Sequence, residues 1–427
     1  MLVLRDAGTH GVGVFPLDGE LGLVPGSLSP RLLEAAARQG SKMPFAEASG
    51  ELTFFWGVWI SDDTLRRQTE AAGAALTALE DEAVERLERE FPAPPQGPAI
   101  QQVSVDGAMV HLVDGTWAEV KTAAIGTVTT SMNKEGEREV HTTDLSYCSR
   151  LADVASFGRR FKLEVFYRGT QTAGTVVAVQ DGADWIQGLL DTYRPDAVRV
   201  LDFAHLVEHL ATAARAAPTP AGRPCADSPG FRAWLAVAAH ILKHRGPDEI
   251  LVELRELPIS AAADRTTATK LRDETIAYLE ARLPQTQYPL FQAKGYPIGS
   301  GCVESAGKLL VEARLKGSGM RWARRNVCPM VALRAARASG RWDQTWPAIC
   351  QRLRQQEQER HHDRRLQRRL AKGLAVPVAP PCPVAPPKAR PKLSCAHARM
   401  RAAAPPTIVN GKPTADHPWN ATRTKAG

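Results

Sequence analysis

The spacing of apolar residues changes near residue 98, and this change divides the chain into two kinds of structure. Before it, apolar residues recur with a helical period. Helix starts are expected at Ser27–Pro30, near Pro44 and at Ser61, because serine can cap a helix and proline suits its first turn. After it, apolar and polar residues alternate, as they do in strands. Residues 92–98, rich in proline, are expected to form a linker between the two parts.

Residues 28–91 are expected to form a helical DNA-binding domain. Three helices, of which the last carries Arg66 and Arg67, fit a helix-turn-helix in which these arginines contact DNA. The alternative is an ordinary helical bundle in which both arginines belong to a solvated face. Residues 1–27 are rich in glycine and are expected to be an irregular N-terminal remnant.

Residues 99–346 are expected to form one α/β domain. Two alternating stretches, Ile100–Val110 and Trp117–Val128, are joined at Asp114-Gly115, a dipeptide typical of hairpin turns. A run of strands followed by alternating helices and strands predicts a mixed α/β sheet. Residues 206–290 have a helical pattern and are expected to be a helical insertion. The remaining predicted elements are a strand at 139–145, a helix at 152–167, a strand at 175–180, a helix at 185–193 and a strand at 197–201.

Positive charge is concentrated at the end of the chain. The net charge is +8, but residues 351–427 hold 16 Lys and Arg against 4 Asp and Glu, whereas the other 350 residues hold 38 against 42. Residues 347–427 are therefore expected to be a basic, proline-rich tail that is mostly disordered, apart from a candidate basic helix at 351–372. The basic excess favours a polyanionic partner such as DNA.

The cysteines and the hydropathy pattern indicate a compartment. The seven cysteines are scattered and form no Cys-x-x-Cys pair, which indicates neither a disulfide framework nor a zinc site and favours the reducing cytoplasm. No apolar run approaches the length of a membrane-spanning helix, so no membrane partner is expected.

Three acidic residues lie where a metal site can be built. Asp106 and Asp181 each end a predicted strand and precede Gly-Ala, and Glu304 lies in the first turn of a predicted helix, Val303–Leu315. Mg²⁺ prefers carboxylate oxygens, and two such ions about 4 Å apart support phosphoryl transfer from DNA. We therefore expect the three carboxylates within roughly 4–8 Å of one another around two Mg²⁺ or Mn²⁺ ions. Each Asp-Gly-Ala taken alone is equally typical of a plain turn, and Asp184 is a decoy that suits a helix N-terminus better.

Several motifs in one order resemble those of a family of mobile-element enzymes. They are Val105-Asp106-Gly107-Ala108-Met109-Val110 with Trp117-Ala118-Glu119-Val120-Lys121, Asp181-Gly182-Ala183-Asp184-Trp185-Ile186, Leu201-Asp202-Phe203-Ala204-His205, Tyr296-Pro297-Ile298-Gly299-Ser300-Gly301-Cys302-Val303-Glu304, Arg314-Leu315-Lys316-Gly317-Ser318-Gly319-Met320-Arg321-Trp322, Gly340-Arg341-Trp342 and His417-Pro418-Trp419. Together they resemble the Kra-type insertion-sequence transposases, bacterial relatives of the Mutator-like group. The resemblance covers about residues 15–346.

The resemblance implies an RNase H-like fold and a DDE transposase that cuts and joins DNA at the ends of an insertion sequence. It implies that Asp106, Asp181 and Glu304 are the catalytic triad. It also implies that Asp202 and His205 form an Asp-x-x-His signature that supports the site, although His205 is equally well explained as a structural histidine contacting Asp202. A homodimer or larger oligomer on DNA, in the bacterial nucleoid, is expected.

One feature departs from the family pattern. A small cysteine-based, zinc-ribbon-like region usually precedes the segment that corresponds to Phe15-Pro16-Leu17-Asp18, whereas this chain has His10 but no cysteine before Cys148. Either the start omits that region or the metal site has decayed. An active recombinase, a non-catalytic DNA-binding copy and a nuclease that only hydrolyses DNA therefore all stay open.

A basic cluster follows the helix that carries Glu304. Its position close to the proposed metal ions suits contacts with DNA phosphates, and the alternative is a plain solvated surface. The cluster comprises Arg314, Lys316, Arg321, Trp322, Arg324 and Arg325.

Overall fold

The computed structural model describes residues 28–136, 138–215, 229–256, 265–371, 408–409 and 412–413. The chain divides into two compact units, one up to Arg365 and one from Leu366. In the second unit the described residues comprise the end of a helix and a short antiparallel pair, β6 (Ile408–Val409) with β7 (Lys412–Pro413). The glycine-rich residues 1–27 and most of the proline-rich tail lie outside the described residues.

Three helices open the first unit, as the sequence predicts: α2 (Pro30–Lys42), α3 (Phe45–Trp56) and α4 (Asp62–Glu90). The Ser29 hydroxyl accepts a hydrogen bond from the Leu32 N–H, and the Ser61 hydroxyl accepts one from the Thr64 N–H, so both serines cap their helices as expected. The third helix is 29 residues long. Its apolar side packs against a late helix, α14 (Arg324–Ala338), so the N-terminal helices share a core with the rest of the unit.

The centre of the unit is a mixed, open sheet with the strand order β3-β2-β1-β4-β5. The first three strands pair antiparallel, and β4 and β5 add parallel to β1 on its other side. The predicted mixed α/β class is therefore confirmed. The third strand is longer than the predicted edge strand because its second half pairs with β2 as well. The strands are β1 (Ile100–His111), β2 (Trp117–Met132), β3 (Arg138–Arg150), β4 (Thr175–Gln180) and β5 (Val198–Leu201).

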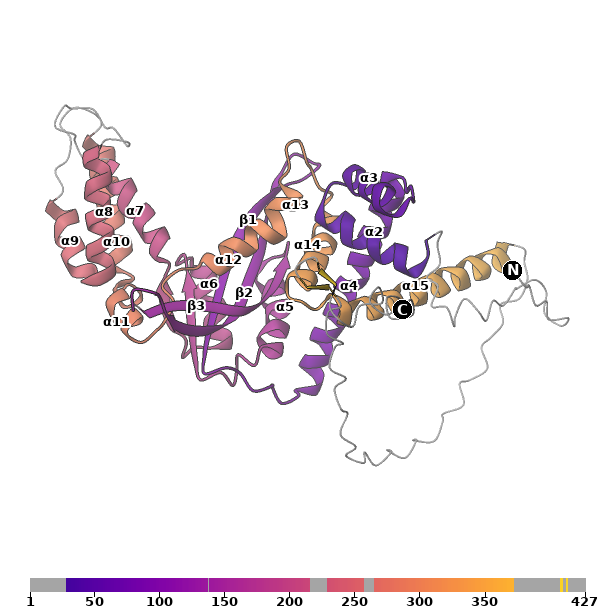
Figure 1. Ribbon diagram of the computed structural model, residues 1–427, viewed down its shortest axis with the longest axis horizontal. Helices are drawn as coiled ribbons and strands as arrows, with labels where there is room; N and C mark the ends of the chain where they lie inside the picture. Colours follow the sequence, from indigo (N-terminus) through magenta and orange to yellow (C-terminus); the bar gives the residue numbers. More distant parts are fainter. Residues whose placement is uncertain are drawn as a thin grey trace, which may run out of the picture. The chain divides into compact units, whose positions relative to one another are not determined.

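Alternation along β1 assigns its two faces to different layers. Val103 and Val105 pack with Phe157 and Phe161 of α5 (Val154–Tyr167). Residues of the opposite parity pack with the helical stretch that carries Glu304 and with α14. The stretch consists of α12 (Gly301–Ala306), a π-helical segment η2 (Gly307–Glu312) and α13 (Ala313–Leu315), and it crosses the sheet in Figure 1.

The predicted insertion is a group of helices beyond the parallel strands. Figure 1 shows α7, α8, α9 and α10 side by side. Their apolar faces share one core with Val177 and Val179 of β4 and Leu201 of β5, so the insertion packs on the strand ends. Its elements are α7 (Phe203–Arg215), α8 (Pro229–His244), α9 (Pro247–Glu256), α10 (Arg265–Glu280), η1 (Leu283–Gln285) and α11 (Tyr288–Ala293), and α6 (Asp184–Tyr193) precedes β5.

The predicted start of the tail at residue 347 is wrong. A 30-residue helix, α15 (Trp342–Ala371), runs through that position. Trp342, Trp346 and Leu353 lie on one side of it and are buried against α2, α4 and α14. The first compact unit therefore extends to Arg365, because this apolar side continues past residue 346.

Candidate active site

Three aspartates lie on or just after neighbouring strands. Asp106 lies within β1 rather than at its end as predicted, because this strand continues to His111 in its pairing with β2. The pairing of β1 with β4 ends three residues before Asp106 and Asp181, and Asp202, whose N–H donates to the Gln180 carbonyl, directly follows β5. Alternation places Asp106 on the side of β1 that faces α12, opposite the face that packs on α5.

The helix of Glu304 is held alongside β1 by side chains of the same parity. Gln102 donates from Nε2 to the Gly299 carbonyl at 3.0 Å, and the Ser104 hydroxyl lies within hydrogen-bonding reach of the Cys302 thiol. Asp106 is the next residue in this series, and Glu304 is two residues beyond Cys302. The Ser300 hydroxyl donates to Oε1 of Glu304 at 3.3 Å. Residues 299–304 therefore lie alongside residues 102–106 of β1, which brings the Asp106 and Glu304 carboxylates to the same region.

Asp202 fixes the turn that precedes Glu304. Its carboxylate is buried and accepts from the Ser300 N–H at 2.5 Å and from the His205 N–H at 2.7 Å. Phe203 N–H donates to the Ile298 carbonyl at 3.0 Å beside it. Asp202 thus joins the end of β5, the start of α7 and the Gly-Ser-Gly turn, and its contact with His205 runs through the backbone rather than the imidazole ring.

The pKa of Asp106 depends on burial and on the charges of Asp181 and Glu304. Burial raises the pKa of Asp106, the Gly107 N–H opposes this by donating to Oδ1 at 2.7 Å, and the negative charges of Asp181 and Glu304 raise the pKa further, with a smaller contribution from Glu119. An unpaired cluster of acids behaves in this way. The site therefore favours a cation.

The donor chemistry fits a hard divalent ion, since carboxylate oxygens are its preferred ligands. Within the described residues, no three His, Cys, Asp or Glu side chains are already gathered as ligands for one metal ion. The acids of Asp106, Asp181 and Glu304 thus form an open acidic cluster in which like charges repel. The decoy Asp184 opens α6, and its side chain points into solvent with 102% relative exposure.

Two residues of the insertion that the sequence analysis did not single out hold the turn after Asp181. The Tyr278 hydroxyl donates to the Asp181 carbonyl at 2.6 Å, and Arg282 Nη2 donates to the Gly182 carbonyl at 3.0 Å. Gly182 has φ +83°, and a Cβ there would lie 2.7 Å from Arg282 Nε and 3.0 Å from the Tyr278 hydroxyl. The Asp-Gly sequence is the one local signal of this close approach.

The imidazole of His205 belongs to an aromatic stack beside the same turn. Its Nε2 lies 3.2 Å from Nε2 of His209. The His209 ring stacks on the Tyr278 ring with 4.1 Å between centroids, and the Arg282 guanidinium lies 4.1 Å from the centroid of the Tyr278 ring. Burial lowers the pKa of His209, and His205 and Arg282 add to the effect. Asp202 thus contacts the turn before Glu304, and the His205 ring lies beside His209 and Tyr278.

The π-helical segment after Glu304 has an identifiable partner. Arg334 of α14 donates from Nε to the Leu310 carbonyl at 2.9 Å and from Nη2 to the Leu309 carbonyl, and Nη1 donates to the Ser41 carbonyl at 2.5 Å. A π-helical turn widens the helix and is frequent near functional sites. Arg334 therefore fixes the rotation of the η2 segment about its own axis relative to α2 and α14.

The basic cluster divides into buried and exposed members. Arg314 and Trp322 are 2% and 7% exposed, so neither belongs to a solvated basic surface. Lys316 is exposed and pairs with Glu312 at 2.8 Å. The guanidinium-bearing residues that reach solvent are Arg321, Arg324 and Arg325.

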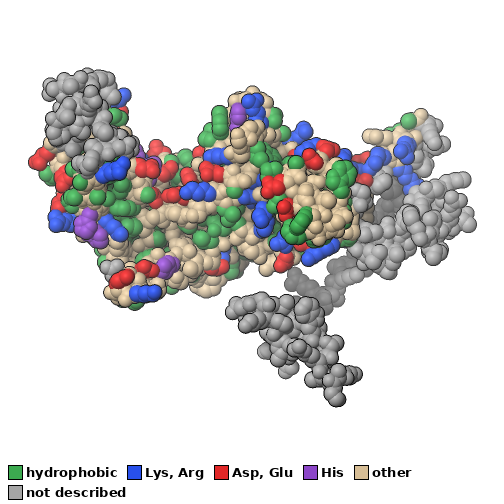
Figure 2. Space-filling view, turned by 45° about the horizontal axis from the view of Figure 1, so that its top comes forward, with side chains coloured by type: hydrophobic (Ala, Val, Ile, Leu, Met, Phe, Trp, Pro, Cys, Tyr) green, Lys and Arg blue, Asp and Glu red, His purple; other side chains and the backbone are tan. Residues whose placement is uncertain are grey.

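The N-terminal arginines are engaged with carboxylates. Arg66 lies 2.6 Å from Asp63 and 3.0 Å from Glu70, and Arg67 lies 3.1 Å from Asp63. Both remain solvent-accessible, as either a DNA-binding or a solvated face requires. Figure 2 shows Lys and Arg interspersed with Asp and Glu on the face drawn, without a single basic region.

In comparisons with known proteins, no family model and no curated protein matches the chain. None of the described helices combines the length and the apolar character needed to cross a membrane.

Proposed function

We propose that this protein is a transposase of the DDE type, which cleaves DNA strands at the ends of an insertion sequence and joins them to target DNA, on an RNase H-like fold. The observation that carries the proposal is that Asp106 in β1 lies close enough to Asp181, just past β4, and to Glu304 of α12 for their charges to add to the effect of burial in raising the pKa of Asp106. A mixed sheet, a helical insertion after its last strand and then the acidic helix follow the order that the motif resemblance implies.

Asp106, Asp181 and Glu304 would hold two Mg²⁺ or Mn²⁺ ions. When bound, such ions supply activation of the attacking oxygen and stabilisation of the leaving oxygen. Pairing with Thr122 of β2 fixes the backbone of Asp106, and the Tyr278 hydroxyl holds the Asp181 carbonyl. The Asp202 carboxylate holds the Ser300 N–H in the turn before Glu304. These supports matter because reacting groups must be positioned to a fraction of an ångström.

The residues around the acids orient them before any ligand binds. The Gly107 N–H donates to Asp106, and the Ala183 N–H donates to Asp181 Oδ1 at 2.9 Å, so one oxygen of each carboxylate is held by the backbone of its own turn. Gly107 also permits close packing, since a Cβ there would lie 2.1 Å from Oε1 of Glu119. Each acid is therefore presented in a restrained orientation.

A non-catalytic DNA-binding protein of the same fold is the second candidate. It is favoured by one observation, that no three potential ligand side chains in the described parts of the chain are gathered for a metal ion. It predicts DNA binding without strand cleavage under any metal condition. The two candidates therefore differ in one measurable activity.

The test is cleavage and joining of duplexes that carry the inverted repeats bordering the gene, with Mg²⁺ or Mn²⁺. Glu304→Gln preserves size but removes one charge of the cluster. We expect it to lower cleavage by about 10³-fold or more, as loss of a group that acts on the transition-state charge does, while binding of the same duplex changes little.

Asp184→Asn is the matched control, because Asp184 is three residues from Asp181 and its side chain is fully exposed. We expect it to retain most of the cleavage activity. Activity in Glu304→Gln equal to that of the parent, or no cleavage by the parent with either ion, would leave DNA binding alone as the function.

A further inference from the structure

A cavity of about 310 Å³ lies between the N-terminal helices and the segment that follows α13. Its volume is at the lower end of the range of ligand pockets, about 300–1,000 Å³. Phe45 and the Arg66 side chain come from one side, and Arg314, Arg321 and Trp322 come from the other. The remaining lining residues are Pro44, Glu70, Met320, Ala323 and Asn326.

Two buried nitrogen donors in the walls of this cavity have no acceptor. Arg314 Nη2 and Trp322 Nε1 are both shielded from solvent and lack a hydrogen-bond partner. A buried donor without a partner costs about 1–3 kcal/mol, and most such groups in folded proteins are satisfied. Both atoms belong to residues that line this cavity, so acceptor oxygens entering it would be the nearest source of the missing partners.

The Arg314 guanidinium is held rigidly but is not neutralised. It lies between the rings of Phe45 and Trp322, at 4.6 and 4.9 Å from their centroids, and Nε donates to the Gly40 carbonyl at 3.1 Å. Within the described residues it forms no ion pair with a carboxylate, and Nη1 reaches only the sulfur of Met320 at 3.9 Å. Burial lowers the pKa of Arg314 to about 10, and the nearby Arg334 adds to this.

The charge of the cavity is positive. Arg66, Arg314 and Arg321 line it, against a single carboxylate, Glu70. Glu70 is occupied by Arg66 at 3.0 Å and by Asn326 Nδ2 at 2.8 Å, so it does not reach Arg314 by an ion pair. An anion entering the cavity therefore meets fixed cations and free N–H donors.

We infer that this cavity binds a phosphate group, with Arg314 Nη2 and Trp322 Nε1 as its inner donors and Arg66 and Arg321 at its walls. Guanidinium groups bind phosphate oxygens through charge-assisted hydrogen bonds. The flexible Met320 side chain lies against Arg314 and is the group that must move to admit the oxygens. A phosphate there joins the N-terminal helices to the segment after α13. DNA as the source of this phosphate rests on the proposed function.

The experiment titrates the full chain with inorganic phosphate at constant ionic strength and follows binding by ³¹P NMR line width. Arg314→Lys keeps a charge but removes the Nη2 donor. We expect it to weaken phosphate binding by about tenfold or more, the effect of one lost charge-assisted hydrogen bond. Arg245→Lys, the same substitution in an exposed pair with Glu249, should leave binding unchanged.

Glu70→Gln separates a binding role from a folding defect, because it removes the one carboxylate of the cavity and should strengthen binding by about fivefold. Phosphate affinity unaffected by both Arg314→Lys and Glu70→Gln overturns the site. A short DNA duplex that displaces the phosphate identifies its backbone as the source, and a duplex without effect identifies a free phosphate or small phosphoester. Glu304→Gln should bind phosphate normally, so failure of the catalytic proposal is seen separately.

Discussion

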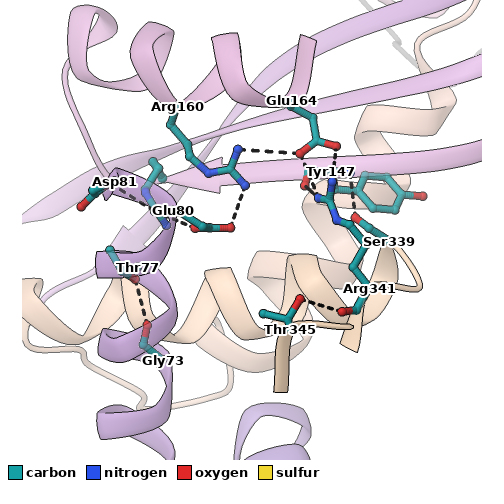
Figure 3. Close-up of polar contacts among 11 residues, drawn as sticks. Gly73, Thr77, Glu80, Asp81, Tyr147, Arg160, Glu164, Ser339, Arg341 and Thr345 are labelled. Atoms are coloured by element: carbon teal, nitrogen blue, oxygen red, sulfur yellow. Dashed lines mark hydrogen bonds and ion pairs between the residues drawn. The ribbon is translucent and has the colours of Figure 1, made fainter. Parts of the chain in front are cut away.

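Two groups of charges in this protein differ in whether the chain supplies the opposite charge. In the first, Glu80 of α4 lies 2.7 Å from both Arg150 of β3 and Arg160 of α5. Figure 3 shows the contact between Glu80 and Arg160. In the second, Asp106 faces the like charges of Asp181 and Glu304. Among the described residues, the carboxylates of the first group have arginine partners, whereas none of the three acids of the second forms an ion pair. Buried carboxylates with such partners belong to the fold, whereas acids grouped without them are candidates for binding a cation.

The Glu80 group also ties the end of the sheet to the last helices. The carboxylate of Glu164 is buried and accepts from Arg341 at 2.8 and 2.9 Å, and Arg160 lies 3.7 Å away from it. Figure 3 shows the two arginines converging on Glu164 from different elements. Arg341 belongs to the Gly-Arg-Trp motif of the sequence, which is thereby explained by packing rather than by chemistry on DNA.

The largest stability effect is expected from opening the Glu80 group. Glu80→Ala leaves Arg150 and Arg160 without their carboxylate and should lower the free energy of unfolding by about 3 kcal/mol or more, as broken buried pairs do. The measurement is urea unfolding followed by circular dichroism. Glu88→Ala removes an exposed pair with Arg159 on the same helix and should cost less than about 1 kcal/mol. Equal losses in the two variants would show that burial is not what distinguishes these pairs.

The pH dependence of this stability follows from Glu80. Burial alone would raise the pKa of Glu80, but the guanidinium groups of Arg160 and Arg150 outweigh it and hold the pKa below its ordinary value. The contribution of Glu80 is therefore present at neutral pH and is lost as the pH falls through its folded-state pKa. In Glu80→Ala the acid-induced loss of stability should be smaller than in the parent.

The acidic cluster, unlike the Glu80 group, should add to the stability of the fold only when a divalent ion binds. A divalent ion that binds only the folded chain stabilises it by about 2.7 kcal/mol at a hundred times its Kd. Asp106→Asn should abolish most of this gain from MgCl₂, measured as a thermal shift against NaCl of equal ionic strength. In metal-free buffer at neutral pH the same variant should melt above the parent, because it removes a charge whose burial, together with the repulsion of Asp181 and Glu304, raises the pKa of Asp106. A variant that melts below its parent without metal would show that Asp106 is structural.

The elements that carry the acids were predictable because their signals are local. The strand ending before Asp181 has the predicted bounds, and the Asp114-Gly115 turn joins β1 to β2 as expected. Alternation, turn dipeptides and helix caps need no knowledge of distant residues. The position of Glu304 in the first turn of its helix follows from the same kind of signal.

The partners of those acids were not predictable, since they come from far along the chain. Tyr278 reaches the Asp181 carbonyl across 97 residues, and Arg334 reaches the Ser41 carbonyl across 293. Arg314 has the composition of a surface residue, and only tertiary packing between Phe45 and Trp322 buries it. Side-chain type and spacing cannot distinguish a buried arginine from a solvated one.

The smallest effects on stability are expected from substituting exposed arginines. These substitutions compare arginines that have carboxylate partners with arginines that have none among the described residues. Arg324 and Arg325 occupy the first turn of α14, where the helix dipole disfavours cations, so their removal should not destabilise the fold. If both contact DNA phosphates, Arg324→Ala with Arg325→Ala should lower the slope of log K against log salt by about 2, at about 0.9 per contact.

Arg66→Ala with Arg67→Ala is the matched pair of changes, because Asp63 and Glu70 already hold these side chains. We expect this variant to lower the salt slope by less than about 1 and the free energy of unfolding by less than about 1 kcal/mol. Arg66 and Arg67 carry the same charge as Arg324 and Arg325 but have carboxylate partners. Comparing the slopes of log K against log salt for the two double variants therefore shows how much such partners reduce the contribution of an arginine to DNA binding. A larger slope change from the N-terminal pair would show that DNA displaces their carboxylates, and would assign them to a recognition helix.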